Sequence, residues 1–220
     1  MADESAALPV VIRPADDEDL EWMAGLHMAQ LPHGFFTALG PRFLRAYHRT
    51  FMHSPNAVAL VAEIDREPVG FVIGAVNAIE HRRSVMQAHG VRLAASGARS
   101  LMVRPALAAE FVRTRAFRYL RAIRRSLRRS SGVSASTQVA GPGCAVLAHA
   151  AVGTSSERRG AGSALVRAFA AAVAERGATR IELVTLADDR GAADFYSRLG
   201  WQPVGPPTKA EFRRFELELR

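Results

Sequence analysis

The sequence predicts a mixed α/β fold in which one central sheet of about six to seven strands is flanked by helices. Strand-like and helical segments alternate late in the chain, and two strand-like segments follow each other across a short turn early in the chain. The 220 residues suit a single domain, residues 1–220, and the 49% that are apolar are enough for a sizeable core. We therefore expect one domain with an insertion.

The N-terminal half, residues 8–78, contains the early strands. "LPVVIRPA" is expected to form a strand halted by Pro14, and "DDEDLEWMAGLHMAQ" a helix with Asp16 as its N-cap and Asp19 at the third helical position. "LPHGFF" is expected to be a break, and "GPRFLRAYHRTFMHS" a second helix with Pro41 in its first turn. "AVALVAEI" and "PVGFVIGAV" are predicted to pair as a hairpin around "DREP".

The C-terminal half, residues 141–220, alternates strands and helices. "CAVLAHAAV" is predicted to be a strand, followed by a helix from Ser163 to about Arg176 that ends at Gly177. "TRIELVTLA" is the next strand, and "GAADFYSRLG" a short helix closed by Gly200. "WQPVG" and "FRRFELEL" are expected to be the last two strands.

Residues 79–140 form a basic insertion between these halves. Between His81 and Ser130 there are 13 arginines and one acidic residue, Glu110, although the whole chain has a net charge of only +8. "AEFVRTRAFRYLRAIRRSLRRS" is expected to be a helix whose arginines form a solvated face, a surface for an anionic acceptor or partner, or a membrane-surface contact. Its apolar face could also pack against a second subunit in a homodimer. Nucleic-acid binding is not favoured, because lysine is nearly absent and the arginine excess matches a GC-rich coding bias.

Several function classes find no support in the sequence. There is no run of 18 apolar residues to span a membrane and no secretory signal at the N-terminus, so a cytoplasmic location is expected. Cys144 is the only cysteine, which excludes an intramolecular disulfide, and it is expected to fill a strand start rather than act as a nucleophile. Without a Cys/His cluster or an HExxH motif, no metal site is expected.

The stretch "SSERRGAGSALVRAF" has the features of a phosphate cradle. Gly160 and Gly162 let the backbone approach a ligand, and the first amides of the following helix point outward at the positive end of its dipole. Arg158 and Arg159 add charge that pairs with phosphate oxygens. Taken alone, the pattern is more typical of a tight turn into a core helix, and it lacks the Walker and full Rossmann signatures.

Together with its neighbours, this stretch resembles the acetyl-CoA-binding half of the GCN5-related N-acetyltransferase (GNAT) superfamily. The family pattern Gln/Arg-x-x-Gly-x-Gly/Ala follows a strand ending in Val, and here Val152 stands eight residues before Gly160. A second family pattern is matched by "DRGAADFYSRLGW", with Ala192 and Tyr196 in register. Two positions depart from the patterns: Glu157 replaces Gln/Arg, and Asp189 replaces the usual Asn.

The resemblance implies the GNAT fold and acetyl-CoA as co-substrate, with no metal. It implies backbone N–H groups around Ala151 and Val152 that bind the thioester oxygen, and Tyr196 as the acid that protonates the departing thiolate. Tyr196 could instead be a packed core aromatic. The residues expected to bind the cofactor are Ala151, Val152, Gly153, Arg158, Arg159, Gly160, Ala161, Gly162, Ser163, Asp189 and Ala192.

A base must take a proton from the acceptor amine. His149 lies on the strand before the loop, and an ordinary imidazole pKa near 6.5 suits the task, although a histidine in an apolar strand can also be a hydrogen-bonded core residue. Glu63 and Glu67 are weaker alternatives. The acceptor pocket is expected to involve His33, Phe35 and Phe36 of "LPHGFF", or else these rings belong to the core.

The expected function is N-acetyl transfer from acetyl-CoA to an amine of a small-molecule or peptide acceptor, possibly an anionic one. The alternative is a non-catalytic module that binds acyl-CoA, or a polyanion such as nucleic acid, through the arginine-rich insertion.

Overall fold

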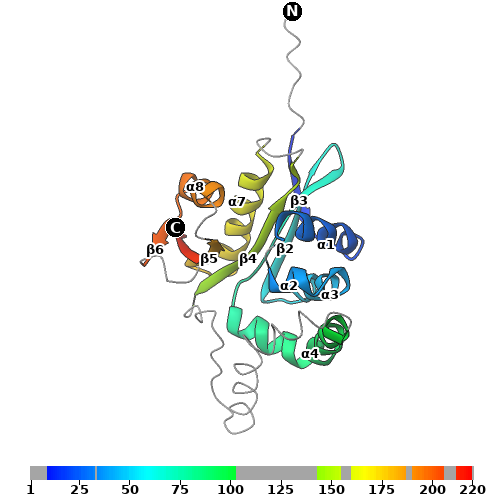
Figure 1. Cartoon of the computed structure of the whole chain (residues 1–220). Coiled ribbons are helices and arrows are strands. Elements are labelled where there is room, and N and C mark those ends of the chain that lie inside the picture. The colour runs from blue at the N-terminus through cyan, green and yellow to red at the C-terminus, as the bar shows by residue number, and fades with distance from the viewer. Residues whose placement is uncertain are drawn as a thin grey trace, which may run out of the picture.

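Seven strands form one sheet in the order β1-β2-β3-β4-β5-β7-β6 in the computed structural model (Figure 1). The structure describes residues 9–32, 34–102, 143–154, 160–186, 190–205 and 212–219. The β4–β5 pair is parallel and the other five pairs are antiparallel. The mixed α/β fold predicted from the sequence is therefore confirmed. The strands are β1 Val11–Pro14, β2 Ala57–Ile64, β3 Glu67–Ala75, β4 Cys144–Val152, β5 Arg180–Leu186, β6 Gln202–Val204 and β7 Phe212–Glu218.

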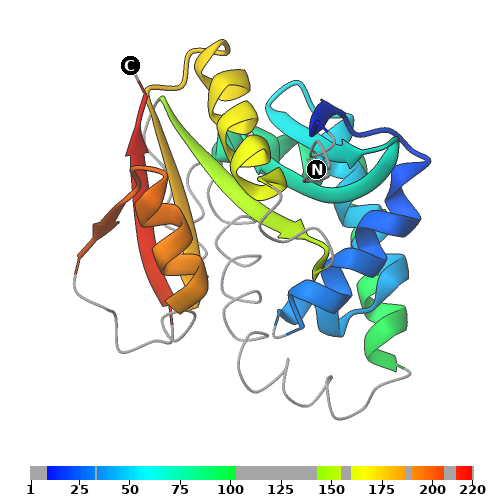
Figure 2. The same ribbon diagram turned by 90° about the horizontal axis from the view of Figure 1, so that it is seen from above.

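Helices cover both faces of the sheet. The described helices are α1 Asp19–Gln30, α2 Phe35–Ala38, α3 Pro41–Met52, α4 Ala78–Met102, α7 Ala161–Ala174 and α8 Arg190–Arg198. Helix α7 contacts β2, β3 and β4 on one face, while α1 and α3 contact the other face and α4 packs on α3 (Figures 1 and 2). In the described part of the chain, no helix is long and apolar enough to cross a membrane.

Two apolar clusters result, one on each face of the sheet. In β3, Val72 belongs to the cluster under α7, whereas Phe71 and Ile73 belong to the cluster under α1 and α3. This division follows from the two-residue side-chain period of a strand, which sends neighbours to opposite faces. Burial of both apolar faces supplies the main favourable contribution to folding.

Helix α7 approaches the sheet most closely at Gly74 of β3. A Cβ atom built there would lie 2.4 Å from Cζ of Phe169 and 2.4 Å from the carbonyl oxygen of Val146. Glycine is therefore required at this position for steric reasons, because both the helix side chain and the β4 backbone occupy the space of a side chain.

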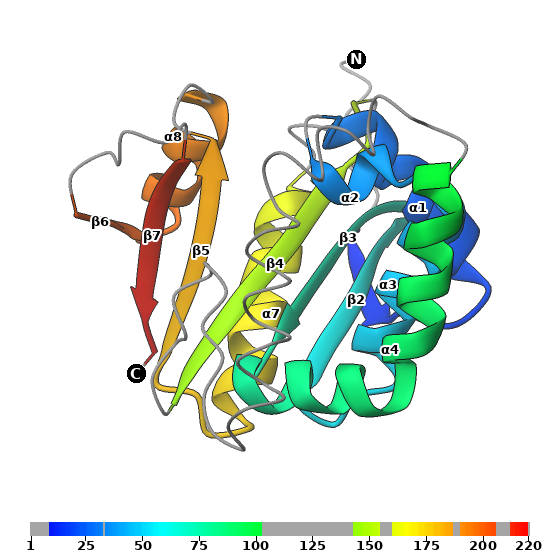
Figure 3. The ribbon, with the colours of Figure 1, turned by 60° about the horizontal axis from the view of Figure 1, so that its bottom comes forward.

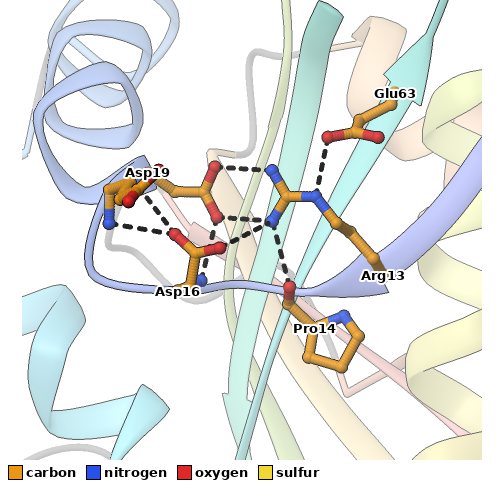
Figure 4. Close-up of polar contacts among 6 residues, drawn as sticks. Arg13, Pro14, Asp16, Asp19 and Glu63 are labelled. Atoms are coloured by element: carbon orange, nitrogen blue, oxygen red, sulfur yellow. Dashed lines mark hydrogen bonds and ion pairs between the residues drawn. The ribbon is translucent and has the colours of Figure 1, made fainter. Parts of the chain in front are cut away.

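The first helix begins later than the sequence indicated. Its N-cap is Glu18 and its first residue is Asp19, so the prediction of Asp16 as N-cap is wrong. Instead, Oδ1 of Asp16 accepts hydrogen bonds from the amides of Glu18 and Asp19 in the preceding turn (Figure 4). The Asp19 carboxylate turns away from the helix end, because it receives two hydrogen bonds from Arg13, at 2.7 and 2.8 Å.

Two further segments differ from the sequence-based expectation. Phe35 and Phe36, expected in a break, begin the four-residue helix α2, and the cradle helix begins at Ala161 rather than Ser163. The hairpin at Asp65 and Arg66 is confirmed, and both residues have positive φ, at 54° and 62°. Helix α4 occupies the first part of the insertion, and the arginine-rich helix predicted after it lies outside the described residues.

Candidate functional site

Strands β4 and β5 part after a short paired stretch. Their ladder joins Cys144, Ala145 and Val146 to Arg180, Ile181 and Glu182, and no further pair is recorded between the described residues of the two strands. Figure 3 shows the two strands close together at this end and diverging toward the other. Beyond Val146, the β5-facing backbone groups of β4 have no ladder partner on β5, which leaves N–H and C=O groups for a ligand.

The hydrogen bonds of β4 indicate which amides face this gap. The N–H of Gly153 donates to the carbonyl of Val69 in β3, over 2.8 Å. Because successive residues of a strand direct their backbone groups to opposite sides, the N–H of Val152 faces the β5 side and that of Ala151 faces β3. Of the residues predicted around the thioester, Val152 is thus the one placed to donate, while the amide of Gly153 is occupied.

The loop after β4 leads into α7 through Gly160. Gly160 is the N-cap of α7, with φ of +83°, and a Cβ added there would meet nothing within 4 Å. The helix has no side-chain cap and no acidic residue in its first turn. The first amides of a helix lack intrahelical partners, so those of Ala161, Gly162 and Ser163 are suited to an anion. Arg158, Arg159 and Glu157 lie outside the described residues.

Gly162 brings α7 close to α8. A Cβ on Gly162 would lie 3.4 Å from Cζ of Phe195 and 3.6 Å from Cγ2 of Val152, which are ordinary contacts. The start of α7, the end of β4 and α8 therefore meet at one place, although α8 comes from a later part of the sequence. Ala192 lies on α8, and Asp189 just before it is outside the described residues.

Tyr196 projects from α8 into an aromatic group. Its ring centroid lies 5.1 Å from that of Phe195, 5.5 Å from that of Trp201 and 6.2 Å from that of Phe215. Trp201 and Phe215 are almost fully buried, whereas Tyr196 is half-buried. Tyr196 is thus a packed aromatic residue that also keeps part of its surface in contact with solvent.

On the other face of the sheet, His149 belongs to a cluster of histidine and tyrosine side chains. Nε2 of His149 lies 3.3 Å from the hydroxyl oxygen of Tyr47 in α3, and its ring centroid is 4.7 Å from that of His27 in α1. Nδ1 of His27 lies 3.1 Å from Nε2 of His48, and both of these residues are buried.

Burial keeps these imidazoles neutral. Desolvation lowers the pKa of His27 to about 4, and desolvation followed by the neighbouring His27 lowers the pKa of His149 to about 3. His48 is shifted in the same direction for the same reasons. The structure therefore differs from the expectation of an ordinary imidazole pKa at His149: the ring is neutral at pH 7, but it is a weak base.

The acceptor residues predicted from "LPHGFF" lie partly within this cluster. The ring of Phe36 has its centroid 4.6 Å from that of Tyr47 and 6.4 Å from that of His149. Phe35 contacts Phe36, at 6.1 Å between centroids, and both are half-buried. His33 lies outside the described residues. The rings of Phe36, Tyr47 and His149 thus form one wall above β4.

The alternative bases are located elsewhere. Glu63 accepts a hydrogen bond from Nε of Arg13 at 2.6 Å, and Glu67 is exposed at the start of β3. Within the described ranges, no group of three or more His, Cys, Asp or Glu residues could hold a metal ion.

Tyr47, His27 and His48 were not singled out from the sequence. Each lies on a helical segment in which an isolated histidine or tyrosine has no distinguishing neighbour. Tyr47 and His149 are 102 positions apart, so their contact has no local signal. The signal available in the sequence was the helical spacing of apolar residues in α3, which predicts that His48 faces the sheet.

One family model matches part of this sequence, and several solved structures share its fold. The model of the Acetyltransferase (GNAT) family matches residues 120–201. The crystal structure of SsHAT is 20% identical, with a TM-score of 0.61, covering 95% of this chain and 98% of its own. The ribosomal-protein-S18-alanine N-acetyltransferase of Escherichia coli is 13% identical, with a TM-score of 0.53, covering 96% of this chain and 94% of its own.

A third similar structure was solved with a cofactor. The PaiA N-acetyltransferase of Thermoplasma acidophilum, in complex with coenzyme A, is 10% identical with a TM-score of 0.52, and the match covers 96% of this chain and 100% of that protein. Among curated proteins, none matches this sequence significantly. These structural matches show that the fold is shared.

Proposed function

We propose that this protein is a member of the GNAT acetyltransferase family and that it transfers the acetyl group of acetyl-CoA to an amine of a small-molecule or peptide acceptor. The observation that carries the proposal is the parting of β4 and β5 directly before the loop and helix that match the family pattern. The gap provides backbone hydrogen-bond donors, and the start of α7 beside it provides amides for a pyrophosphate.

The described residues fit such a cofactor. Gly160 has space where a side chain would stand, the first turn of α7 carries no acidic side chain, and the Val152 amide faces the gap. In the proposed complex, the amides of Ala161, Gly162 and Ser163 bind phosphate oxygens, and Arg158 and Arg159 add positive charge. Gly153, Ala151, Asp189 and Ala192 are proposed to line the same site.

In the proposed reaction the neutral amine attacks the thioester carbon, the new C–N bond forms and the C–S bond breaks. The N–H of Val152 stabilises the negative charge that develops on the carbonyl oxygen. Tyr196 is the proposed donor of a proton to the leaving sulfur, since a tyrosine hydroxyl can act as a general acid. His149 accepts the hydrogen bond of the attacking amine, and Phe35, Phe36 and His33 contribute to the acceptor side.

The central experiment measures release of the CoA thiol with a panel of amines, using acetyl-CoA and longer acyl-CoAs. Tyr196→Phe is expected to lower kcat about 100-fold while leaving the KM for acetyl-CoA nearly unchanged, because the lost group acts on the leaving sulfur. Ser197→Ala, an exposed neighbour on α8, is the matched control and should retain wild-type kcat.

Three results would contradict the proposal. If calorimetry showed no binding of acetyl-CoA to the wild-type protein, acetyl-CoA would be excluded as its co-substrate. If the protein bound acetyl-CoA but released no CoA thiol with any amine, it would be a non-catalytic acyl-CoA-binding module. Retention of polyanions with a steep salt dependence, and no thiol release, would favour the binding role of the arginine-rich segment.

A further inference from the structure

Tyr47 and His149 are the two polar side chains of the wall above β4, and they contact each other. The contact joins α3 to β4 through the phenol oxygen and Nε2, which are 3.3 Å apart. The Tyr47 ring is held from several sides, with ring centroids at 4.6 Å from Phe36 and 5.1 Å from Phe51. Packing on both sides restricts the ring, so the hydroxyl is presented to the imidazole in a defined position.

The two nitrogens of His149 are in different situations. Nε2 is occupied by the Tyr47 hydroxyl, while Nδ1 has no hydrogen-bond partner within the described part of the chain. The side chain is half-buried and faces α1 through His27, α2 through Phe36 and α3 through Tyr47. A neutral imidazole has one N–H and one lone pair, and the partner of one nitrogen decides the state of the other.

We propose that Tyr47 is a positioning residue that accepts the Nε2–H of His149 and thereby holds the tautomer whose Nδ1 lone pair is directed to the acceptor amine. This inference rests on the proposed function, because it assigns the role of Tyr47 in that same reaction. The arrangement follows the same logic as a nucleophile-activating imidazole that is oriented by a third group.

The proton balance of the step is simple. As the C–N bond forms and the C–S bond breaks, the amine N–H proton passes to Nδ1, while Nε2–H remains bonded to the phenol oxygen. The sulfur takes its proton from Tyr196. The imidazolium then releases the Nδ1 proton to water, and the Tyr196 phenolate regains a proton from water, so that both side chains return to their starting states. Burial raises the pKa of Tyr47 and lowers that of His149, so the phenol stays protonated and the imidazole is regenerated in its neutral form.

The test compares Tyr47→Phe with wild-type protein by two independent measurements. The nitrogen-15 chemical shifts of the His149 ring, assigned by their loss in His149→Gln, report which nitrogen carries the proton. Steady-state kinetics with the best acceptor amine report its consequence. Tyr47→Phe removes only the hydroxyl and preserves the ring that packs against Phe36 and Phe51.

Thr50→Val is the matched control on the same helix. The Thr50 hydroxyl is buried and donates to the Tyr47 carbonyl at 2.7 Å, so this change also removes one buried hydroxyl from α3 but leaves the phenol in place. Thermal unfolding of both variants shows whether they are folded. The control is expected to keep the wild-type tautomer and kcat.

In Tyr47→Phe we expect the His149 signals to move toward an average of the two tautomers and kcat to fall about tenfold, with the KM for acetyl-CoA unchanged. Tyr47→Phe combined with His149→Gln should be no slower than His149→Gln alone. Unchanged ring shifts in a folded Tyr47→Phe protein, or additive losses in the double variant, would overturn the inference. Failure of every amine in wild-type protein would reject the proposed function, and the ring shifts would still decide whether Tyr47 controls the tautomer.

Discussion

At the scale of single residues, the described interior holds three buried histidines. His27, His48 and His81 are buried, and burial lowers the pKa of each. A charged imidazole in these places would lose its hydration without gaining a carboxylate partner among the contacts recorded for them. The native state therefore resists protonation where the unfolded chain accepts it.

The first prediction concerns the pH dependence of stability. In the unfolded chain, a histidine has a pKa of about 6.5 and becomes protonated as the pH falls below that value. In the native state, the pKa of His27 is about 4, so its ring stays neutral over most of this range. The unfolded state therefore binds more protons than the native state. The free energy of unfolding should therefore decrease as pH falls from 7.5 to 5.0, by up to about 1.4 kcal/mol per pH unit for each histidine. Urea denaturation at the two pH values measures it.

A control variant separates this cluster from other histidines. His89→Gln, on α4 and outside the cluster, should leave the difference between the two pH values unchanged, while His27→Gln should reduce it. Equal stability of the wild-type protein at pH 7.5 and 5.0 would show that the buried rings do not control it.

The second prediction concerns the ion pairs of Arg13 (Figure 4). Arg13 binds Asp19, whose side chain is 7% exposed, as well as Glu63. Burial alone would raise the pKa of Asp19, but hydrogen bonds from Arg13 and the Asp16 amide outweigh it and lower the pKa. Arg13→Met should cost about 3–5 kcal/mol in the free energy of unfolding at pH 7, because it leaves a buried carboxylate unpaired.

Arg45→Met is the matched comparison for Arg13. Arg45 pairs with Glu21, which is mostly exposed, and the loss of such a surface pair should cost less than about 1 kcal/mol. Guanidinium denaturation of both variants gives the two values. Similar costs would mean that burial of Asp19 does not set the strength of the Arg13 contacts.

At the scale of elements, α7 has two glycines with the same backbone conformation at its two ends. Gly160 precedes the helix with φ of +83° and Gly177 follows it with φ of +85°, and a Cβ at either position meets nothing within 4 Å. The left-handed conformation costs a residue with a side chain about 1–2 kcal/mol. The two positions thus have the same backbone requirement, and they differ in their proximity to the proposed cofactor.

The third prediction uses this pair. Gly160→Ala and Gly177→Ala should each lower the free energy of unfolding by about 1–2 kcal/mol. Only Gly160→Ala is expected to raise the Kd for acetyl-CoA, because its methyl group stands where the backbone would approach phosphate. Calorimetric titration of the two variants measures the difference. An equal Kd in both would argue against a cradle at the start of α7.

At the scale of the whole molecule, Gly74 sets how closely the α7 layer and the sheet approach. The fourth prediction is that Gly74→Ala lowers the free energy of unfolding by about 3 kcal/mol, at the upper end of the usual cost of overpacking, since both the Phe169 ring and the Val146 carbonyl must move. Chemical denaturation followed by circular dichroism measures the loss.

Gly97→Ala is the control for this change. A Cβ there would make ordinary contacts with Phe43, 3.8 and 3.9 Å away, and alanine suits the interior of α4. We expect a gain of about 0.5–1 kcal/mol, opposite in sign to the effect at Gly74. A neutral Gly74→Ala variant would show that the contact between layers is looser than the structure indicates.

Much of the fold could be predicted from local patterns. The hairpin, the strand before the cradle and the helix of Tyr196 were recognisable, because their periodicity and end residues are encoded within about ten neighbouring positions. Asp16 was misassigned as N-cap because the helix begins only after Glu18. The carboxylate of its first residue, Asp19, binds Arg13, and that contact depends on how β1 and α1 pack.

The candidate site, like the fold, could be predicted from the sequence only where it depends on neighbouring residues. By itself, the sequence determined the strand–loop–helix order around Gly160 and the position of Tyr196 on its helix, because these depend on neighbouring residues. The tertiary structure alone decided where β4 leaves β5, which amide faces the gap, and that Tyr47 meets His149. Those features depend on packing between segments up to 102 positions apart, and no local pattern records such a contact.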